Sequence, residues 1–139
     1  MWQKQFWVIV MSEDASVIVT GASRGIGKAI ALSVAEHAKT IGVRKIVLIA
    51  RDEDKLNEVA ALAQQNNVTT ELLVRKLDLE QVDLIPNFVM NISTLLTERV
   101  ILINNAGYTL PASVLETDNQ NLLRTFSVNV FAPIIMVRE

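Results

Sequence analysis

A glycine-rich turn at residues 20–27 constrains the fold of this chain more than any other stretch. It follows a short apolar run at residues 17–19 and precedes apolar residues with helical spacing, so it joins a predicted strand to a predicted helix. Its glycines, Gly21, Gly25 and Gly27, provide backbone that no Cβ obstructs. A helix N-terminus exposed in this way can hold a phosphate on its N–H groups. The turn therefore predicts a nucleotide-phosphate site, and the alternative is a tight turn that binds nothing.

Strand and helix patterns alternate along the whole chain. Strands are predicted at residues 16–20, 45–50, 71–77 and 100–103, and helices at 25–40, after Asp52, at 84–96 and from about 119, the last interrupted by Pro133. This alternation is typical of an α/β fold with right-handed crossovers and a doubly wound parallel sheet. We expect one incomplete domain at residues 16–139, preceded by an N-terminal extension at residues 1–15.

Apolar spacing predicts which helix faces are buried. In the first helix an apolar stripe is expected to face the sheet. It consists of Ile26, Ile30, Val34 and Ala38 at every fourth position, with Ala29, Ala31 and Ala35 around them. Gly42 is expected to end this helix, and Asp52 to cap the next one. Pro86 lies near the start of the third helix, where its missing N–H costs little.

Composition excludes several classes of protein. The 139 residues include no cysteine and a single histidine, His37, so a disulfide framework, a thiolate zinc site and a Ser-His-Asp triad are not expected. A net charge of -2 does not favour a nucleic-acid partner. No apolar run is long enough to span a membrane, and the apolar N-terminus lacks a clear export cleavage site, so we expect a cytoplasmic protein without a membrane partner.

Polar residues follow each predicted strand. They are the glycine turn, Arg51, Asp78 and residues 104–107. In parallel α/β sheets, ligands bind beyond the carboxyl ends of the strands where the strand order reverses. These residues are therefore predicted to meet at one ligand site.

Two motifs together indicate a family. The turn has the spacing Gly-x-x-x-Gly-x-Gly, preceded by Thr20, and Asn104-Asn-Ala-Gly107 follows later in the chain. With this pair the chain resembles the short-chain dehydrogenase/reductase family from about Val17 to its end. The resemblance implies a Rossmann-type NAD(P)-binding fold and hydride transfer between a nicotinamide and a small carbonyl substrate.

The resemblance also implies roles for particular residues. Residues of the turn would cradle the pyrophosphate: Gly21, Ser23, Gly25, Ile26 and Gly27. Arg51 stands where NAD-preferring members carry an acidic residue, and with Arg24 it would hold a 2'-phosphate, which favours NADP(H) over NAD(H). Asp52 complicates this interpretation, although helix capping accounts for it.

Later positions would complete the site. Asp78 and Leu79 resemble the family's adenine contact. Residues 104–107, among them Asn105, Ala106 and Gly107, would close over the adenosine ribose and stabilise the sheet. Asn129 matches the catalytic helix asparagine that helps hold a water in the proton relay. The alternatives are an ordinary surface loop at Asp78 and an ordinary polar helix residue at Asn129. Residues 100–107 and 115–118 further resemble the sepiapterin reductase branch.

The family's catalytic tyrosine and lysine have no counterpart here. The only tyrosine is Tyr108, and the residue four positions later is Ala112. We therefore expect an inactive fragment, the cofactor half of an NADP(H)-dependent carbonyl reductase. The alternatives are a non-catalytic NADP(H)-binding or subunit-association protein, and an unstable product with no function. The strand at residues 100–103 would present an open sheet edge that favours homo-oligomers or edge pairing.

Overall fold

The computed structural model describes residues 14–66 and 69–139. Its sheet consists of β1 (Ala15–Thr20), β2 (Val43–Ala50), β3 (Glu71–Lys76) and β4 (Arg99–Ile103), all parallel, in the order β3-β2-β1-β4. The predicted Rossmann-type sheet is thus confirmed. The chain builds outward from β1 to β3 and then returns to the other side of β1, so the strand order reverses between β1 and β4.

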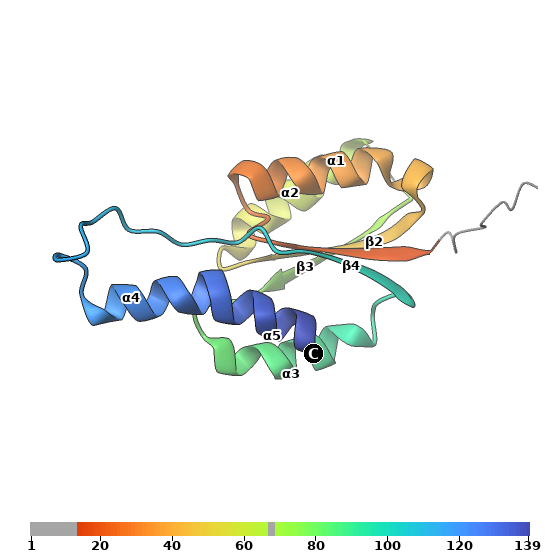
Figure 1. The fold of residues 1–139 in the computed structure, drawn as a ribbon. Coiled ribbons are helices and arrows are strands. Elements are labelled where there is room, and N and C mark those ends of the chain that lie inside the picture. The colour runs from red at the N-terminus through yellow and green to blue at the C-terminus, as the bar shows by residue number, and fades with distance from the viewer. Residues whose placement is uncertain (1–13, 67–68) are drawn as a thin grey trace, which may run out of the picture.

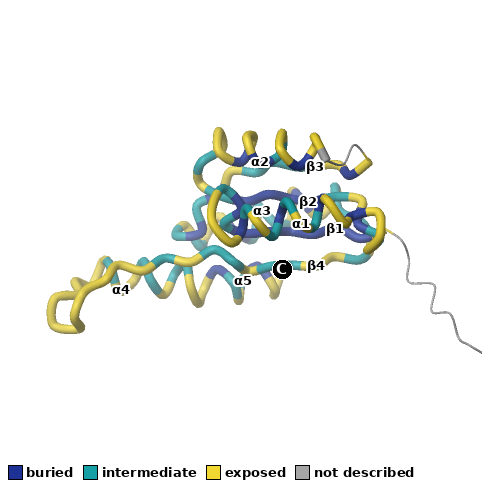
Figure 2. Tube along the Cα trace, turned by 90° about the horizontal axis from the view of Figure 1, so that it is seen from above, coloured by how far each residue is buried: buried dark blue, intermediate teal, exposed yellow. Residues whose placement is uncertain are grey.

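Helices cover both faces of the sheet, as Figure 1 shows. On one face lie α1 (Gly25–Ile41) and α2 (Glu53–Asn66), and on the other lie α3 (Ile85–Ser93) and α5 (Ala132–Arg138), while α4 (Asn119–Phe126) extends beyond the ends of the strands. Each face has its own cluster of buried apolar residues. As a result β1 and most of β2 are buried, whereas β4 is only partly covered (Figure 2).

Some boundaries differ from those predicted. β1 begins at Ala15, one residue before the predicted strand, and residues 1–13 of the expected extension lie outside the described residues. β2 begins at Val43 rather than at residue 45, and β3 ends at Lys76. Gly42 ends α1 with a left-handed φ of 70°, as predicted.

The buried stripe of α1 is rotated from the predicted one. Ile26 is 74% exposed, and the buried positions are the small residues Gly27, Ala31, Ala35 and Ala38. Small side chains let the helix axis approach the sheet closely, which leaves the larger Ile30 and Val34 to pack at the sides of the contact. The predicted orientation of Ile26 toward the sheet was therefore wrong.

α3 is shorter than the predicted helix at residues 84–96. It begins after a 3₁₀ turn, Val82–Leu84, with Pro86 in its first turn as expected. At its end Ser93 Oγ donates to Met90 O (2.8 Å) and Thr94 Oγ1 donates to Asn91 O (3.3 Å). Such side chains compete with helical hydrogen bonds, which explains the early end.

The last helix is distorted before Pro133 rather than interrupted at it. A π-helical segment, Ser127–Phe131, joins α4 to α5, and Ala132 N donates to Ser127 O, five residues back. Pro133 lies in the first turn of α5 and has no N–H to donate to the carbonyl of Asn129. The wider turn lets the chain pass this proline without breaking.

Candidate functional site

A cavity of about 530 Å³ opens at the carboxyl ends of the strands. Residues that follow all four strands line it, as the sequence predicted. The predicted cofactor residues that line it are Gly21, Ser23, Arg24, Ile26, Arg51, Asp78, Leu79, Asn105, Ala106 and Gly107. Further side chains in its wall, for which the sequence predicted no cofactor contact, include Asp52, Lys55, Tyr108, Arg124 and Val128.

The glycine turn brings β1, α1 and the end of β4 close together. Gly21 has a φ of 67°, and a Cβ on it would lie 2.9 Å from Ala106 Cα. A Cβ on Gly27 would collide with the Gly21 carbonyl and with the Asn105 side chain. Gly25 starts α1 with a φ of 56° and has open space where a Cβ would be. The N-terminus of α1 is therefore available to an anion in the cavity.

Thr20 links the glycine turn to the Asn-Asn-Ala-Gly motif. Its hydroxyl accepts hydrogen bonds from the backbone N–H groups of Asn105 (3.0 Å) and Ala106 (3.0 Å) and donates to Ile103 O (3.4 Å). The Asn105 amide returns a bond to Thr20 O (3.0 Å). These bonds join β1 and β4 where the strand order reverses, so the sheet-stabilising part of the predicted role of this motif is visible in the structure.

Four cationic side chains line the cavity: Arg24, Arg51, Lys55 and Arg124. Arg24 and Arg51 are exposed and line it, and within residues 14–66 and 69–139 neither is paired with a carboxylate. Asp52, by contrast, accepts from the Lys55 backbone N–H (3.1 Å) and pairs with Lys55 Nζ (2.7 Å). These hydrogen bonds hold the pKa of Asp52 below its ordinary value, and its predicted helix-capping role is confirmed.

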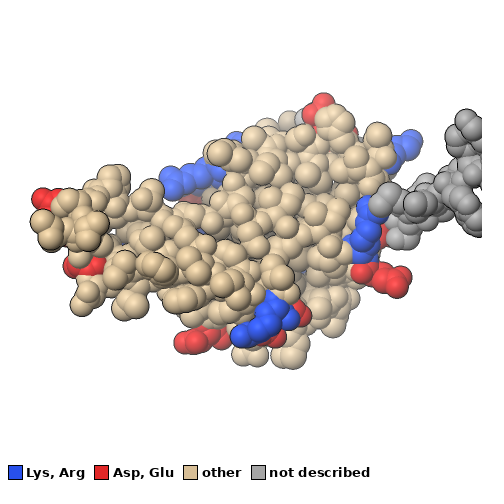
Figure 3. Space-filling view, viewed as in Figure 1, with Lys and Arg blue, Asp and Glu red and all other residues tan. Residues whose placement is uncertain are grey.

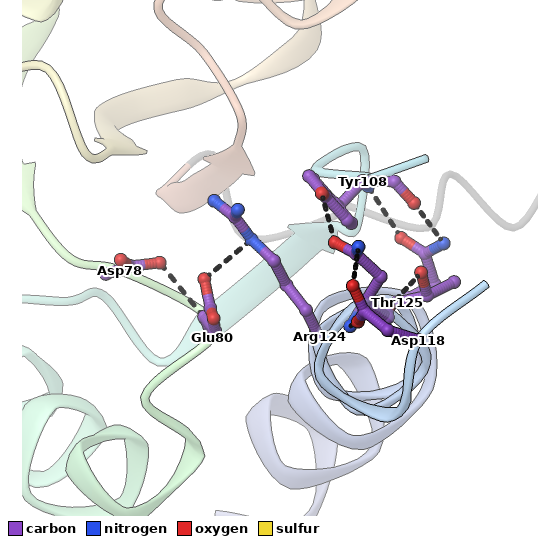
Figure 4. Close-up of polar contacts among 8 residues, drawn as sticks. Asp78, Glu80, Tyr108, Asp118, Arg124 and Thr125 are labelled. Atoms are coloured by element: carbon purple, nitrogen blue, oxygen red, sulfur yellow. Dashed lines mark hydrogen bonds and ion pairs between the residues drawn. The ribbon is translucent and has the colours of Figure 1, made fainter. Parts of the chain in front are cut away.

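Asp78 belongs to a chain of polar contacts that crosses the cavity wall (Figure 4). Its Oδ1 accepts from the backbone N–H of Glu80 (3.1 Å). Glu80 Oε2 lies 2.8 Å from Arg124 Nε, an ion pair rather than an aligned hydrogen bond. The Arg124 guanidinium lies 4.2 Å from the centre of the Tyr108 ring. Nothing in the local sequence indicated these contacts, because the three elements that provide them are far apart in the chain.

The Asn129 side chain holds the loop after β4. Its Oδ1 accepts from Tyr108 N (2.8 Å) and its Nδ2 donates to Tyr108 O (2.8 Å). The Tyr108 hydroxyl in turn donates to Asn121 Oδ1 (3.2 Å) on α4. Asn129 thus lies outside the main cavity, in a neighbouring hollow that Gly107 and Pro133 also line.

Other kinds of site find no support in the described part of the chain. Among residues 14–66 and 69–139, no three His, Cys, Asp or Glu side chains lie together as metal ligands. No helix in the same ranges has the length and apolar character needed to span a membrane. The cavity at the strand ends is therefore the candidate site.

Comparison with known families assigns the chain to a family. The short chain dehydrogenase family model matches residues 15–139. The chain belongs to the short-chain dehydrogenase family. Members of this family are oxidoreductases that bind a nicotinamide cofactor and act on small molecules.

Similar proteins are known in animals and bacteria. Dehydrogenase/reductase SDR family member 11 of Gallus gallus is 34% identical over 88% of this short-chain dehydrogenase chain and 46% of its own length. Benzil reductase of Bacillus cereus is 34% identical over 86% of this chain and 47% of its own length. A metagenomic short-chain oxidoreductase in complex with NADP is similar in structure, with a TM-score of 0.77, 30% identity, and coverage of 89% of this chain and 53% of its own. The chain thus spans about half the length of the relatives it matches.

Proposed function

We propose that this chain is the NADP(H)-binding half of a short-chain reductase whose longer form reduces a small carbonyl compound. The observation that carries the proposal is the pair of arginines, Arg24 and Arg51, which line the cavity without a carboxylate partner in the described residues. Guanidinium groups placed beside a glycine turn can bind a 2'-phosphate through charge-assisted hydrogen bonds. The similar metagenomic oxidoreductase, solved with NADP, supports this choice of cofactor.

The described residues are compatible with such a cofactor. The N-terminus of α1 is open at Gly25, where an added Cβ would meet no atom within 4 Å, so a pyrophosphate could approach its N–H groups. Asp78 lines the far side of the cavity with one oxygen engaged by Glu80 N, which leaves acceptor capacity for an adenine amine. A bound nicotinamide would supply hydride to a carbonyl carbon. The relative named benzil reductase supports a carbonyl as the substrate class.

Tyr108 is assigned a structural role in this proposal. Its hydroxyl is hydrogen-bonded to Asn121 and its ring lies under Arg124, so it fastens α4 beside the cavity. The family's tyrosine and lysine would belong to a longer form of the protein. The water-holding role of Asn129 and the likeness to the sepiapterin reductase branch remain predictions. The Asn129 side-chain amide uses one N–H and one oxygen lone pair in its hydrogen bonds with the Tyr108 backbone. One N–H and one lone pair therefore remain for a water.

Calorimetric titration of the chain with NADPH, and separately with NADH, tests the proposed cofactor. Arg51→Ala should weaken the binding of NADPH about tenfold, because it removes a charge-assisted contact with the 2'-phosphate. The affinity for NADH should change little. Arg44→Ala is the matched control, since Arg44 lies at the start of β2 and pairs with Asp14 (2.7 Å). Equal losses of both cofactors in Arg51→Ala would contradict the 2'-phosphate assignment.

A non-catalytic NADP(H)-binding protein is the second candidate. It is kept because none of these 139 residues provides the family's general acid/base tyrosine: the only tyrosine, Tyr108, is hydrogen-bonded to Asn121. Both candidates predict that this chain binds NADPH. They differ in whether the longer form catalyses a reaction. NADPH oxidation by that form in the presence of a diketone would support the reductase, and binding without turnover would support the second candidate.

A further inference from the structure

An acidic residue lies next to the proposed phosphate site. Asp52 directly follows Arg51, and both line the cavity. A free carboxylate at this place would repel a 2'-phosphate or accept hydrogen bonds from the 2'-hydroxyl of NAD(H). The proposed preference for NADP(H) therefore requires that Asp52 be neutralised.

The structure shows Asp52 engaged at both carboxylate oxygens by one residue. Its Oδ1 accepts from the backbone N–H of Lys55 (3.1 Å), and its Oδ2 lies 2.7 Å from Lys55 Nζ. Asp52 immediately precedes α2 and Lys55 is in the first turn of that helix, so the spacing itself brings the two groups together. The same carboxylate therefore caps the helix and forms an ion pair.

The pair changes the charge that a ligand meets. Arg24, Arg51 and Lys55 are cationic and line the cavity together with Asp52. With Lys55 in place, the Asp52 and Lys55 charges cancel and the two arginines remain uncompensated. Without Lys55, the carboxylate would offset one of them.

We infer that Lys55 is a specificity-determining residue, whose ammonium group neutralises Asp52 so that the cavity beside Arg51 accepts the 2'-phosphate of NADP(H). This role of Lys55 rests on the proposed function. The side chains of Lys55 and Asp52 are 56% and 42% exposed, so solvent screens their interaction. The effect on cofactor preference is accordingly smaller than that of Arg51. NADH carries no phosphate at this position, so loss of the pair should not weaken its binding.

A double-mutant cycle tests this inference by calorimetric titration of the whole chain with NADPH and NADH. Lys55→Gln should weaken the binding of NADPH about fivefold and change the affinity for NADH less than about twofold. Asp52→Asn retains a capping side chain and should not weaken NADPH. Added to Asp52→Asn, Lys55→Gln should change NADPH affinity less than about twofold, because no carboxylate remains to be neutralised. Lys39→Gln, in the last turn of α1, controls for the change in net charge.

The possible results separate the inference from the proposal beneath it. The inference is overturned if Lys55→Gln weakens the binding of both cofactors equally. It is also overturned if Lys55→Gln weakens NADPH binding as much in the Asp52→Asn background as in the unsubstituted chain, because Lys55 would then contact the phosphate directly. If Arg51→Ala weakens NADPH binding selectively but Lys55→Gln does not change it, the inference is overturned and the proposed function stands. If the unsubstituted chain binds NADPH no tighter than NADH, the proposed function fails and the inference fails with it. Circular dichroism of each variant confirms that it is folded.

Discussion

Gly27 lies at the most crowded point of the glycine turn. It is buried in α1, and a Cβ there would collide with the Gly21 carbonyl and with the Asn105 amide. The first of these is backbone and cannot swing aside, so the turn and the end of β4 would have to separate. Gly27 is thus required by packing between β1 and β4, whereas Gly25 is required by its left-handed backbone.

Gly27→Ala should lower the free energy of unfolding by about 2 kcal/mol, because the methyl group overpacks the contact between α1 and the Asn105 loop. Urea denaturation measures the loss. Gly107→Ala is the matched control: the added methyl would lie 3.6 Å from Asn129 Oδ1, an ordinary contact, and its cost should be within about 0.5 kcal/mol. A Gly27→Ala variant as stable as Gly107→Ala would show that the turn is looser than the structure indicates.

Among the elements, α4 is held to the rest of the domain by few contacts. The segment before it, including Val114 (91% exposed) and Leu115 (99% exposed), lies in solvent, and no residue of α4 is buried. Arg124 compensates by connecting the helix to Glu80 after β3 and to the Tyr108 ring after β4 (Figure 4). Since all three residues come from different elements, this contact positions α4 along the cavity.

Arg124→Met should release α4, because it removes both the ion pair and the cation–π contact. We expect the opening free energy of the α4 amides to fall by about 1 kcal/mol, with the β1 and β2 amides unchanged. Hydrogen exchange followed by NMR measures both. Arg138→Met removes an exposed arginine of α5 that pairs only with its neighbour Glu139 among the described residues, and it should leave α4 protected. Equal protection of α4 in the two variants would contradict this role.

At the scale of the whole molecule, β4 is an edge strand of the described sheet. It pairs with β1 on one side, and Val100 and Ile101 are 44% and 41% exposed. Figure 3 shows few charged side chains across the middle of the face that it shares with α5. Beyond Arg99 at its start the strand is apolar, and an apolar strand edge can pair with another chain, so we expect any association to involve this edge.

Ile101→Lys should reduce concentration-dependent association of the chain, because a lysine on an edge strand opposes pairing. Light scattering during size-exclusion chromatography measures the apparent mass over a range of loading concentrations. Ile41→Lys is the matched control, since Ile41 is 47% exposed at the end of α1, away from the edge, and the added charge is the same. A chain that is monomeric at every concentration, or an equal effect of both substitutions, would rule out pairing through β4.

Local patterns in the sequence were sufficient for the order of strands and helices along the chain, the glycine turn, the end of α1 and the start of α2, but not for the early end of α3. Apolar periodicity, the left-handed glycine at Gly42 and the cap at Asp52 depend on residues within one or two turns of each other, so they are visible without tertiary contacts. The family resemblance added the positions of the cavity residues. It worked because the carboxyl ends of parallel strands meet at one edge of the sheet.

Tertiary structure alone decided which side chains meet across that edge. The Thr20 hydroxyl that holds the Asn105 loop, and the contact of Arg124 with Glu80 and Tyr108, join residues far apart in the chain. The rotation of α1 that exposes Ile26 was also decided by packing, because small residues allow a closer approach to the sheet than periodicity alone predicts. Such choices depend on the shapes of several elements at once, and no single stretch of sequence contains them.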